Sequence, residues 1–190
     1  MRIEIFVEEE SIKTLLIEVI PRICNQTSWR LDENIFIRSF EGKSHLRKEL
    51  PRKAKVYANY YESVYLIVFQ DQDSNNCQDL KNQLVNIINE SGLRQFKVRI
   101  VCRELECWYL GDMDAIEQII PSFKSANYQN RAKFRLPEKL NGKDELRKLI
   151  KLYSATEFAK NIGQHLSINN VNKAPSFNLA IQTLKEIICT

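Results

Sequence analysis

The chain has 190 residues, of which 44% are hydrophobic and 27% are charged, and its formal net charge is +4 at pH 7. This length and composition are typical of a single globular domain with a substantial core. No apolar stretch is long enough to cross a membrane, and the opening MRIEIFVEEE lacks the pattern of a signal peptide. We therefore expect a cytoplasmic protein without a membrane partner.

Cysteine and histidine usage argues against two classes of site. The five cysteines form no C-x-x-C pair, and the closest two are Cys102 and Cys107. We expect reduced, mostly buried thiols rather than a zinc site or a disulfide framework. His45 and His165 are the only histidines. Few residues are therefore available for a histidine-ligated metal site or a catalytic triad.

Charge is unevenly distributed along the chain. Residues 1–121 contain 16 Lys and Arg against 19 Asp and Glu, a net charge of −3. Residues 122–190 contain 12 against 5, a net charge of +7. This distribution suits a protein that binds a polyanion, with the basic half in contact with the polyanion and the acidic half holding a metal ion at one end of it. A solvated surface with uneven charge explains the pattern equally well.

The first 40 residues predict a strand, a helix and a second strand. Residues 2–7, RIEIFV, alternate and are rich in β-branched and aromatic side chains. In residues 12–23 the apolar side chains recur at helical spacing. We expect Ser11 to cap this helix and Pro21 to bend or end it. Residues 34–40, NIFIRSF, again have the composition of a strand.

The next 60 residues repeat this alternation. Residues 42–61 predict a helix that Pro51 interrupts. The apolar run SVYLIVFQ, residues 63–70, is typical of a central parallel strand covered on both faces. Residues 77–90 predict a helix, and residues 95–102 predict a fourth strand.

Alternating strands and helices are typical of a parallel sheet wrapped by helices. We therefore expect an α/β fold in which residues 1–121 form a central parallel four-stranded sheet flanked by helices. Residues 122–190 are expected to add a basic loop and a helical C-terminal extension that packs on this core as part of one domain.

The segment after the fourth predicted strand changes character. Residues 104–120 look helical, with a break near Gly111 and a new start that Asp114 and Glu117 could cap. Residues 122–141 are polar, basic and loop-like. Three further segments predict the helices of the tail: residues 144–153, 154–166 and 176–188.

Acidic residues follow three of the four predicted strands. In an open parallel sheet, ligands bind outside the carboxyl ends of the strands. The acids expected at that edge are Glu8, Glu9 and Glu10 after the first strand, Asp71 and Asp73 after the third, and Glu104 and Glu106 after the fourth. So many carboxylates repel one another unless a cation compensates them, and Mg²⁺ or Mn²⁺ with oxygen ligands is the natural cation.

A simpler role remains open for several of these acids. Asp73 or Ser74 could cap the helix of residues 77–90, and Glu9 and Glu10 fit solvent-exposed or capping positions. The sequence does not decide between Glu104 and Glu106. The coincidence of three strand ends favours the metal site over the capping interpretation for Asp71 and Asp73.

Basic and aromatic side chains supply candidate contacts to nucleic acid. The segment GKSHLRKELPRKAK holds six Lys and Arg against one acid, which suits a phosphate backbone but also a solvated helix. Trp108 and Tyr109 could stack on a base, although their helical spacing favours the core. The candidate phosphate contacts are Lys43, Arg47, Lys48, Arg52 and Lys173.

Five segments together resemble a known family. FVEEES, FEGKSHLRKELP, VFQDQDSNNC, CRELECWYLGD and KAPSFNLAIQTL occur in this order and span nearly the whole chain. They resemble the Toprim-type catalytic domain. The likeness is greatest to domain-of-unknown-function family 4276, an uncharacterised bacterial family in which V-E-G-x-S/T, D-x-D-x-x-D/N-C and E-x-E-x-W-x-x-x-D recur.

The resemblance implies a Toprim-like (Rossmannoid) fold, with Glu8 as the first acid and Asp71 and Asp73 as the aspartate pair. In the Toprim group these positions bind Mg²⁺ and support cleavage or joining of phosphodiesters, as in topoisomerases, primases and overcoming-lysogenisation-defect nucleases. Members of the uncharacterised family resemble those nucleases and are associated with an ATPase partner in defence against phage. The chain departs from the pattern at Glu9, where glycine is expected, and at Ile12, where an acid is common.

These observations predict a nuclease-like protein that depends on Mg²⁺ or Mn²⁺ and acts on DNA or RNA. Glu8, Asp71 and Asp73 would hold the ion, and Glu104 or Glu106 would hold a second ion or act as general base. No tyrosine stands out as a covalent nucleophile, which favours hydrolysis.

Two other functions fit the same residues. The chain could be a non-catalytic subunit that binds nucleic acid or an ATPase and keeps the acidic edge. Less well supported is phosphoryl transfer through an aspartyl nucleophile at Asp71. The chain has no Walker motif, so any use of ATP must come from a partner.

Overall fold

The computed structural model describes residues 1–151 and 153–189. The predictions that included Leu152 and Thr190 in the helical tail lie outside the described residues. No helix formed by the described residues is long and apolar enough to cross a membrane.

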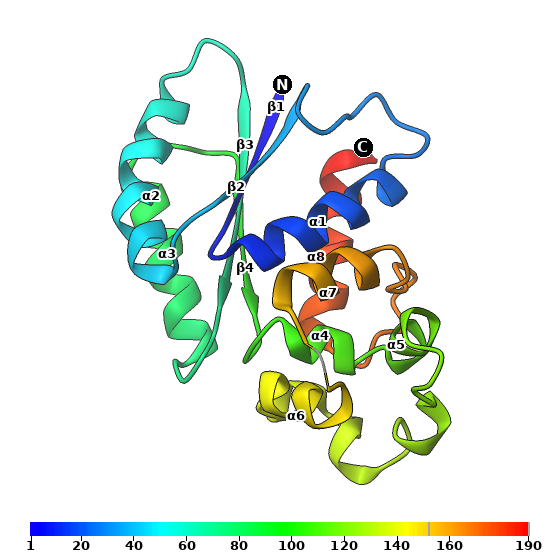
Figure 1. Ribbon diagram of the computed structural model, residues 1–190. Helices are drawn as coiled ribbons and strands as arrows, with labels where there is room; N and C mark the ends of the chain where they lie inside the picture. The colour runs from blue at the N-terminus through cyan, green and yellow to red at the C-terminus, as the bar shows by residue number, and fades with distance from the viewer. Residues whose placement is uncertain (152, 190) are drawn as a thin grey trace.

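A four-stranded parallel sheet forms the centre of the molecule, as predicted (Figure 1). The strand order is β2-β1-β3-β4, so the strand ends that carry the acids belong to three adjacent strands. The strands are β1 (Arg2–Val7), β2 (Ile35–Ser39), β3 (Val64–Asp71) and β4 (Phe96–Val101). Because all four are parallel, their carboxyl ends share one edge.

Helices cover both faces of the sheet, so the α/β class is confirmed (Figure 1). One face packs on α2 (Lys43–Ala58) and α3 (Cys77–Glu90). The other face packs on α1 (Glu10–Ile23), α4 (Glu106–Leu110), α5 (Met113–Ile119) and the tail helices. Alternation along β1 explains the two cores, since Ile5 and Val7 enter one and Phe6 enters the other.

The described part of residues 122–190 forms short helical segments, which pack on the face of the sheet that α1, α4 and α5 cover. These are three 3₁₀ helices (Ser125–Asn127, Ala132–Arg135 and Pro137–Lys139), α6 (Gly142–Leu149), α7 (Ala155–Gly163) and α8 (Pro175–Ile188). The core on this face combines residues from both halves of the chain, such as Trp108 with Phe177. Trp108 and Tyr109 are fully buried, which places them in the core rather than at a base-stacking surface.

One proline prediction is wrong. Pro51 does not interrupt its helix, because α2 runs unbroken from Lys43 to Ala58. The helix continues because Leu46, Leu50 and Ala54 are buried on both sides of the proline, and this packing outweighs one lost backbone hydrogen bond. In α1, Pro21 lies in the last turn, and the helix ends two residues later, at Ile23, close to the end that the sequence predicted.

The predicted helix caps are also wrong. Ser11 is buried within the first turn of α1, whose N-cap is Glu9. The N-cap of α5 is Asp112, which accepts from the backbone of Ala115 at 3.3 Å and from the backbone of Ser167 at 2.8 Å. One aspartate therefore caps a helix and also fastens the tail to the core, which Asp114 and Glu117 could not do from within α5.

Gly111, between α4 and α5, permits a close approach of the segment before α8. A Cβ atom there would lie 1.9 Å from Asn172 Oδ1. The buried Asn172 side chain donates to Trp108 O and accepts from Ala174 N, each at 2.8 Å. We expect Gly111→Ala to displace this side chain and lower the free energy of unfolding by about 3 kcal/mol in urea titrations, because two buried hydrogen bonds break.

The control for this prediction is Asn172→Ala, which removes the same two hydrogen bonds directly. Once Asn172 is truncated, adding Gly111→Ala should cost less than it does in wild type, since the contact of 1.9 Å has gone and only the contact of 2.9 Å with the backbone N of Ala174 is left. Fully additive losses in the double variant would contradict the explanation.

Candidate active site

The carboxyl edge of the sheet brings the predicted acids together. Glu8 follows β1, Asp71 ends the adjacent strand β3, and Glu106 begins α4 just after β4. Glu8 is 6% exposed, and its Oε2 accepts a hydrogen bond from the backbone N–H of Asp71 at 3.2 Å. This bond joins two strand ends 63 residues apart in sequence, as the strand-end argument predicted.

Asp71 is the centre of this group. The residue is half-buried, but its Oδ1 is shielded from solvent and has no hydrogen-bond partner among the described residues. Burial raises the pKa of the Asp71 carboxyl well above 3.8, and the charges of Glu8, Glu9, Glu106 and Asp73 raise it further. Burial also raises the pKa of Glu8, which the Asp71 N–H partly opposes. These carboxyls are therefore held together without enough compensating charge.

Asp73 lies in a strained turn between β3 and α3. Its φ is +51°, in the left-handed region, and its N–H donates to Arg103 O at 3.1 Å. Its carboxylate forms an ion pair with Lys43 Nζ at 2.8 Å. It does not cap α3, because the side chain of Asn76 accepts from the first N–H groups of that helix. The capping interpretation of Asp73 is therefore wrong.

Glu104 and Glu106, which the sequence could not separate, have different environments. Glu106 is 7% exposed and accepts from Tyr153 Oη at 2.7 Å. Glu104 accepts from the backbone N–H of Lys143 at 2.9 Å, at the start of α6. Of the two, Glu106 is the acid whose charge helps to raise the pKa of Asp71, whereas Glu104 joins α6 to the end of β4.

The carboxylate oxygens at this edge are the donor type that a hard divalent cation binds. Among residues 1–151 and 153–189, no three Asp, Glu, His or Cys side chains are arranged as a ready-made metal site. The unpartnered Asp71 Oδ1 beside Glu8 and Glu106 is nevertheless the kind of donor that Mg²⁺ or Mn²⁺ accepts. Side-chain rotation, including release of Asp73 from Lys43, would be needed to complete the set.

Comparison with known protein families identifies the family of this chain. The model of a family described as a domain of unknown function (DUF4276) matches residues 7–185. The chain belongs to this family. No curated protein and no solved structure matches the DUF4276 chain. The match extends over the candidate site and the tail alike, so Tyr153 and α6 belong to the same family unit as the carboxylates.

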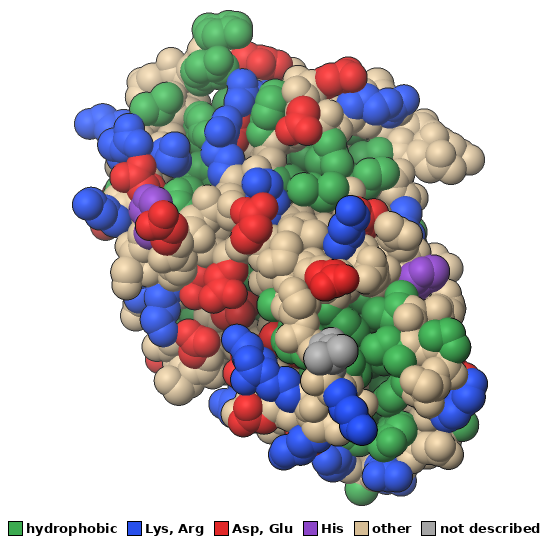
Figure 2. Space-filling model, in the orientation of Figure 1, with side chains coloured by type: hydrophobic (Ala, Val, Ile, Leu, Met, Phe, Trp, Pro, Cys, Tyr) green, Lys and Arg blue, Asp and Glu red, His purple; other side chains and the backbone are tan. Residues whose placement is uncertain are grey.

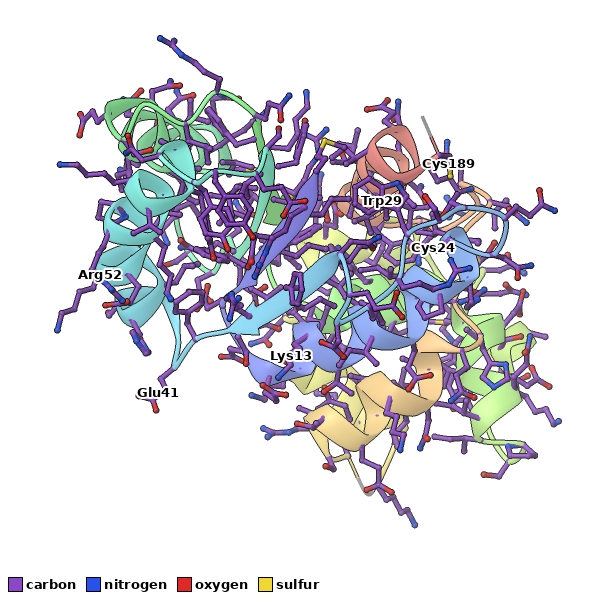
Figure 3. All side chains as sticks on the ribbon, turned by 90° about the horizontal axis from the view of Figure 1, so that it is seen from above. Lys13, Cys24, Trp29, Glu41, Arg52 and Cys189 are labelled. Carbon is purple, nitrogen blue, oxygen red and sulfur yellow. The ribbon has the colours of Figure 1, made fainter. Side chains whose placement is uncertain are left out.

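The predicted phosphate contacts of the DUF4276 chain divide into two groups. Lys43 and Arg47 face the end of β3, where Lys43 pairs with Asp73 and Arg47 donates to Gln70 Oε1 at 3.4 Å. Lys48 and Arg52 are exposed further along α2, and Figure 3 shows Arg52 on the outer side of that helix.

Lys173 does not join this group. Its Nζ donates to Gln129 O at 2.6 Å, and within the described part of the chain no contact links it to the carboxylates. The lysine is instead part of the packing between the segment before α8 and the loop after α5.

Two residues of the site were not foreseen. Tyr153, which orients Glu106, lies 47 residues away from it in sequence, and no local motif connects the two. Arg147 of α6 lies near enough to Tyr153 to oppose the burial and the Glu106 charge that raise the pKa of its hydroxyl. Only the packing of α6 beneath α4 reveals these residues.

The raised pKa of Asp71 predicts a pH-dependent gain of stability in Asp71→Asn. Below about pH 4 this carboxyl is protonated in both the folded and the unfolded chain, so wild type and variant should have similar stability. As pH rises, the unfolded chain loses the proton while the folded chain retains it, and wild type is destabilised. The variant should therefore be more stable than wild type at pH 8, by a difference that grows as the pH rises above about 4.

Thermal unfolding from pH 4 to pH 8 in EDTA measures this difference. Asp114→Asn, at an exposed position of α5, is the matched control and should show no such pH-dependent gain. A variant less stable than wild type at pH 8 would show that Asp71 is charged and favourably paired in the folded chain.

Proposed function

We propose that this protein hydrolyses phosphodiester bonds of nucleic acid with the help of Mg²⁺ or Mn²⁺. The observation that carries the proposal is the partnerless Oδ1 of Asp71 at the carboxyl edge of a parallel sheet, near enough to Glu8 and Glu106 for their charges to raise the pKa of Asp71. Such an arrangement is costly for folding and is typical of sites that gain a cation in function. The Toprim-like order of the sequence motifs supports the same reaction.

Each residue of the site has a distinct part in this proposal. Glu8, Asp71 and Glu106 hold the ion, and Asp73 joins them after leaving Lys43. When bound, the ion neutralises phosphate charge and makes water a better nucleophile. Tyr153 fixes the orientation of Glu106, and the released Lys43 offers its ammonium group to a phosphate oxygen.

Cationic side chains near this edge support a polyanionic substrate. A cavity of about 420 Å³ beside β2 and α2 is lined by the cationic Lys13, Arg38 and Lys53 and by one acid, Glu49. Lys13 and Arg38 also pair with Glu10 and Glu4. Figure 2 shows Asp and Glu side chains beside the β1–α1 connection, with Lys and Arg on either side of them, over α2 and over the part that holds α6. A phosphate backbone that crosses the acidic edge would meet positive charge in both directions.

One observation favours the alternative of a non-catalytic subunit. The ion pair between Lys43 and Asp73 already supplies a cation to the acidic edge, as a retained but inactive site would. In that case the chain binds nucleic acid or an ATPase partner without cleaving. Since the chain itself has no Walker motif, any use of ATP in a proposed role in phage defence would come from an ATPase partner in either case.

The test is cleavage by the purified full-length chain. Supercoiled DNA and end-labelled single-stranded RNA are incubated with wild type and with Asp71→Ala, in Mn²⁺ and in EDTA. We expect nicking or cleavage only by wild type and only with Mn²⁺. Equal activity of the two proteins would end the proposal. Nucleic-acid binding without cleavage, unchanged in Asp71→Ala, would establish the non-catalytic alternative.

A further inference from the structure

Two thiols meet beside the candidate site although they are 25 positions apart in sequence. The Sγ atoms of Cys77 and Cys102 lie 3.9 Å from each other, and both residues are half-buried. Cys77 is the first residue of α3, and Cys102 follows the last residue of β4. A disulfide needs about 2.05 Å between the sulfurs, so a small side-chain movement would bring them to bonding distance.

Hydrogen bonds hold the two segments that carry these thiols close together. The N–H of Gln72 donates to Val101 O at 2.9 Å, and the N–H of Arg103 donates to Gln72 Oε1 at 3.0 Å. The N–H of Cys102 is held by Ser176 Oγ at 3.2 Å. The loops that carry the cysteines are therefore already fastened together, which lowers the conformational cost of linking them.

We propose that Cys77 and Cys102 form a reversible disulfide on exposure to a peroxide, and that this bond is a redox modification site of the protein. One thiolate attacks the O–O bond of hydrogen peroxide, forming an S–O bond and releasing hydroxide, which takes up the thiol proton as water. The second sulfur then attacks the sulfenic acid, the S–S bond forms, and the S–O bond breaks with release of a second water. Two thiols are oxidised, one peroxide is reduced, and a dithiol reductant reverses the reaction.

Environment suggests which sulfur reacts first. Burial raises the pKa of the Cys102 thiol to about 12, and the charge of Glu138 and the neighbouring Cys77 add to this effect. Cys102 therefore stays protonated at neutral pH. We expect Cys77 to react with the peroxide first, and Cys102 then to attack the sulfenic acid formed at Cys77. The overall stoichiometry is the same in either order.

The disulfide would fix the connection that carries Asp73. This aspartate lies between Asp71 and Cys77 in a turn already bonded to Arg103. A bond from Cys77 to Cys102 would tie that turn to the end of β4 from its other side. Cross-linking restricts the unfolded chain, so the oxidised protein should unfold at a temperature higher by about 5 °C or more.

The other three cysteines are either buried or distant from the proposed pair. Cys107 is fully buried, and burial raises the pKa of its thiol to about 12. Cys24 and Cys189 lie near each other at the end of α1 (Figure 3), remote from the β3–α3 connection. Replacing Cys24 and Cys189 with serine removes any reaction at that second location and leaves the proposed pair intact.

The experiment uses the full chain with Cys24→Ser and Cys189→Ser, reduced, desalted and treated with hydrogen peroxide. We expect the intact mass to fall by two hydrogens, a linked peptide containing Cys77 and Cys102, and recovery of both thiols with dithiothreitol. Adding Cys77→Ser or Cys102→Ser should abolish the linked peptide and the rise in unfolding temperature. Sulfinic acid at Cys77 without a linked peptide, in protein of native circular dichroism, would overturn the proposal.

Discussion

Asp71→Asn is expected to reduce Mn²⁺-dependent cleavage by more than about 100-fold. Mutation of residues that merely support a metal ligand typically costs about 10- to 100-fold, and Asp71 is the proposed ligand itself. Asparagine keeps the size of the side chain but removes its negative charge, so the site loses attraction for a divalent ion. The measurement is the initial rate of nicking across a range of Mn²⁺ concentrations.

Stability and activity should move in opposite directions in this variant. Because Asp71→Asn removes a poorly compensated carboxyl, the folded chain should be at least as stable as wild type at neutral pH, so lost cleavage cannot be attributed to unfolding. Asp114→Asn is the matched control, with the same chemical change at an exposed position. Retention of wild-type cleavage rates by Asp71→Asn would exclude a metal-binding role for Asp71 in the reaction.

The strand-end rule predicted that Glu8 and Asp71 meet at one edge of the sheet. Alternating or continuous apolar runs located the four strands, and parallel pairing then required Glu8 and Asp71 to share an edge. This inference succeeded because strand direction is a property of the whole sheet and does not depend on local detail. The sequence left the choice between Glu104 and Glu106 open for the opposite reason, since it depends on how the chain turns from β4 into α4.

Features that depend on packing between segments far apart in the chain could not be predicted from the sequence. Pro51 looked like a helix breaker because its local effect is unfavourable, but the burial of Leu50 and Ala54 decides the outcome. The contact of Tyr153 with Glu106 and the pairing of Cys77 with Cys102 link segments without a shared motif. Such contacts follow from the packing of the tail and the loops on the finished sheet.

Charge reversal on α2 should weaken nucleic-acid binding strongly. Lys48 and Arg52 are exposed one helical turn apart, and Lys48 forms no ion pair within the described part of the chain. If each contacts one phosphate, the double variant Lys48→Glu, Arg52→Glu releases two fewer counterions on binding. At about 0.1 M salt this corresponds to a loss of roughly 50-fold in affinity for double-stranded DNA.

The salt dependence identifies the cause of the loss. Binding measured by fluorescence anisotropy in EDTA, where no cleavage occurs, should show the slope of log affinity against log salt reduced by about 1.8 in the double variant. Arg94→Glu with Lys97→Glu makes the same change of net charge at exposed positions near the start of β4, at the opposite end of the sheet from the carboxylates. An equal loss in both double variants would mean that net charge alone governs binding, and that α2 has no special place in it.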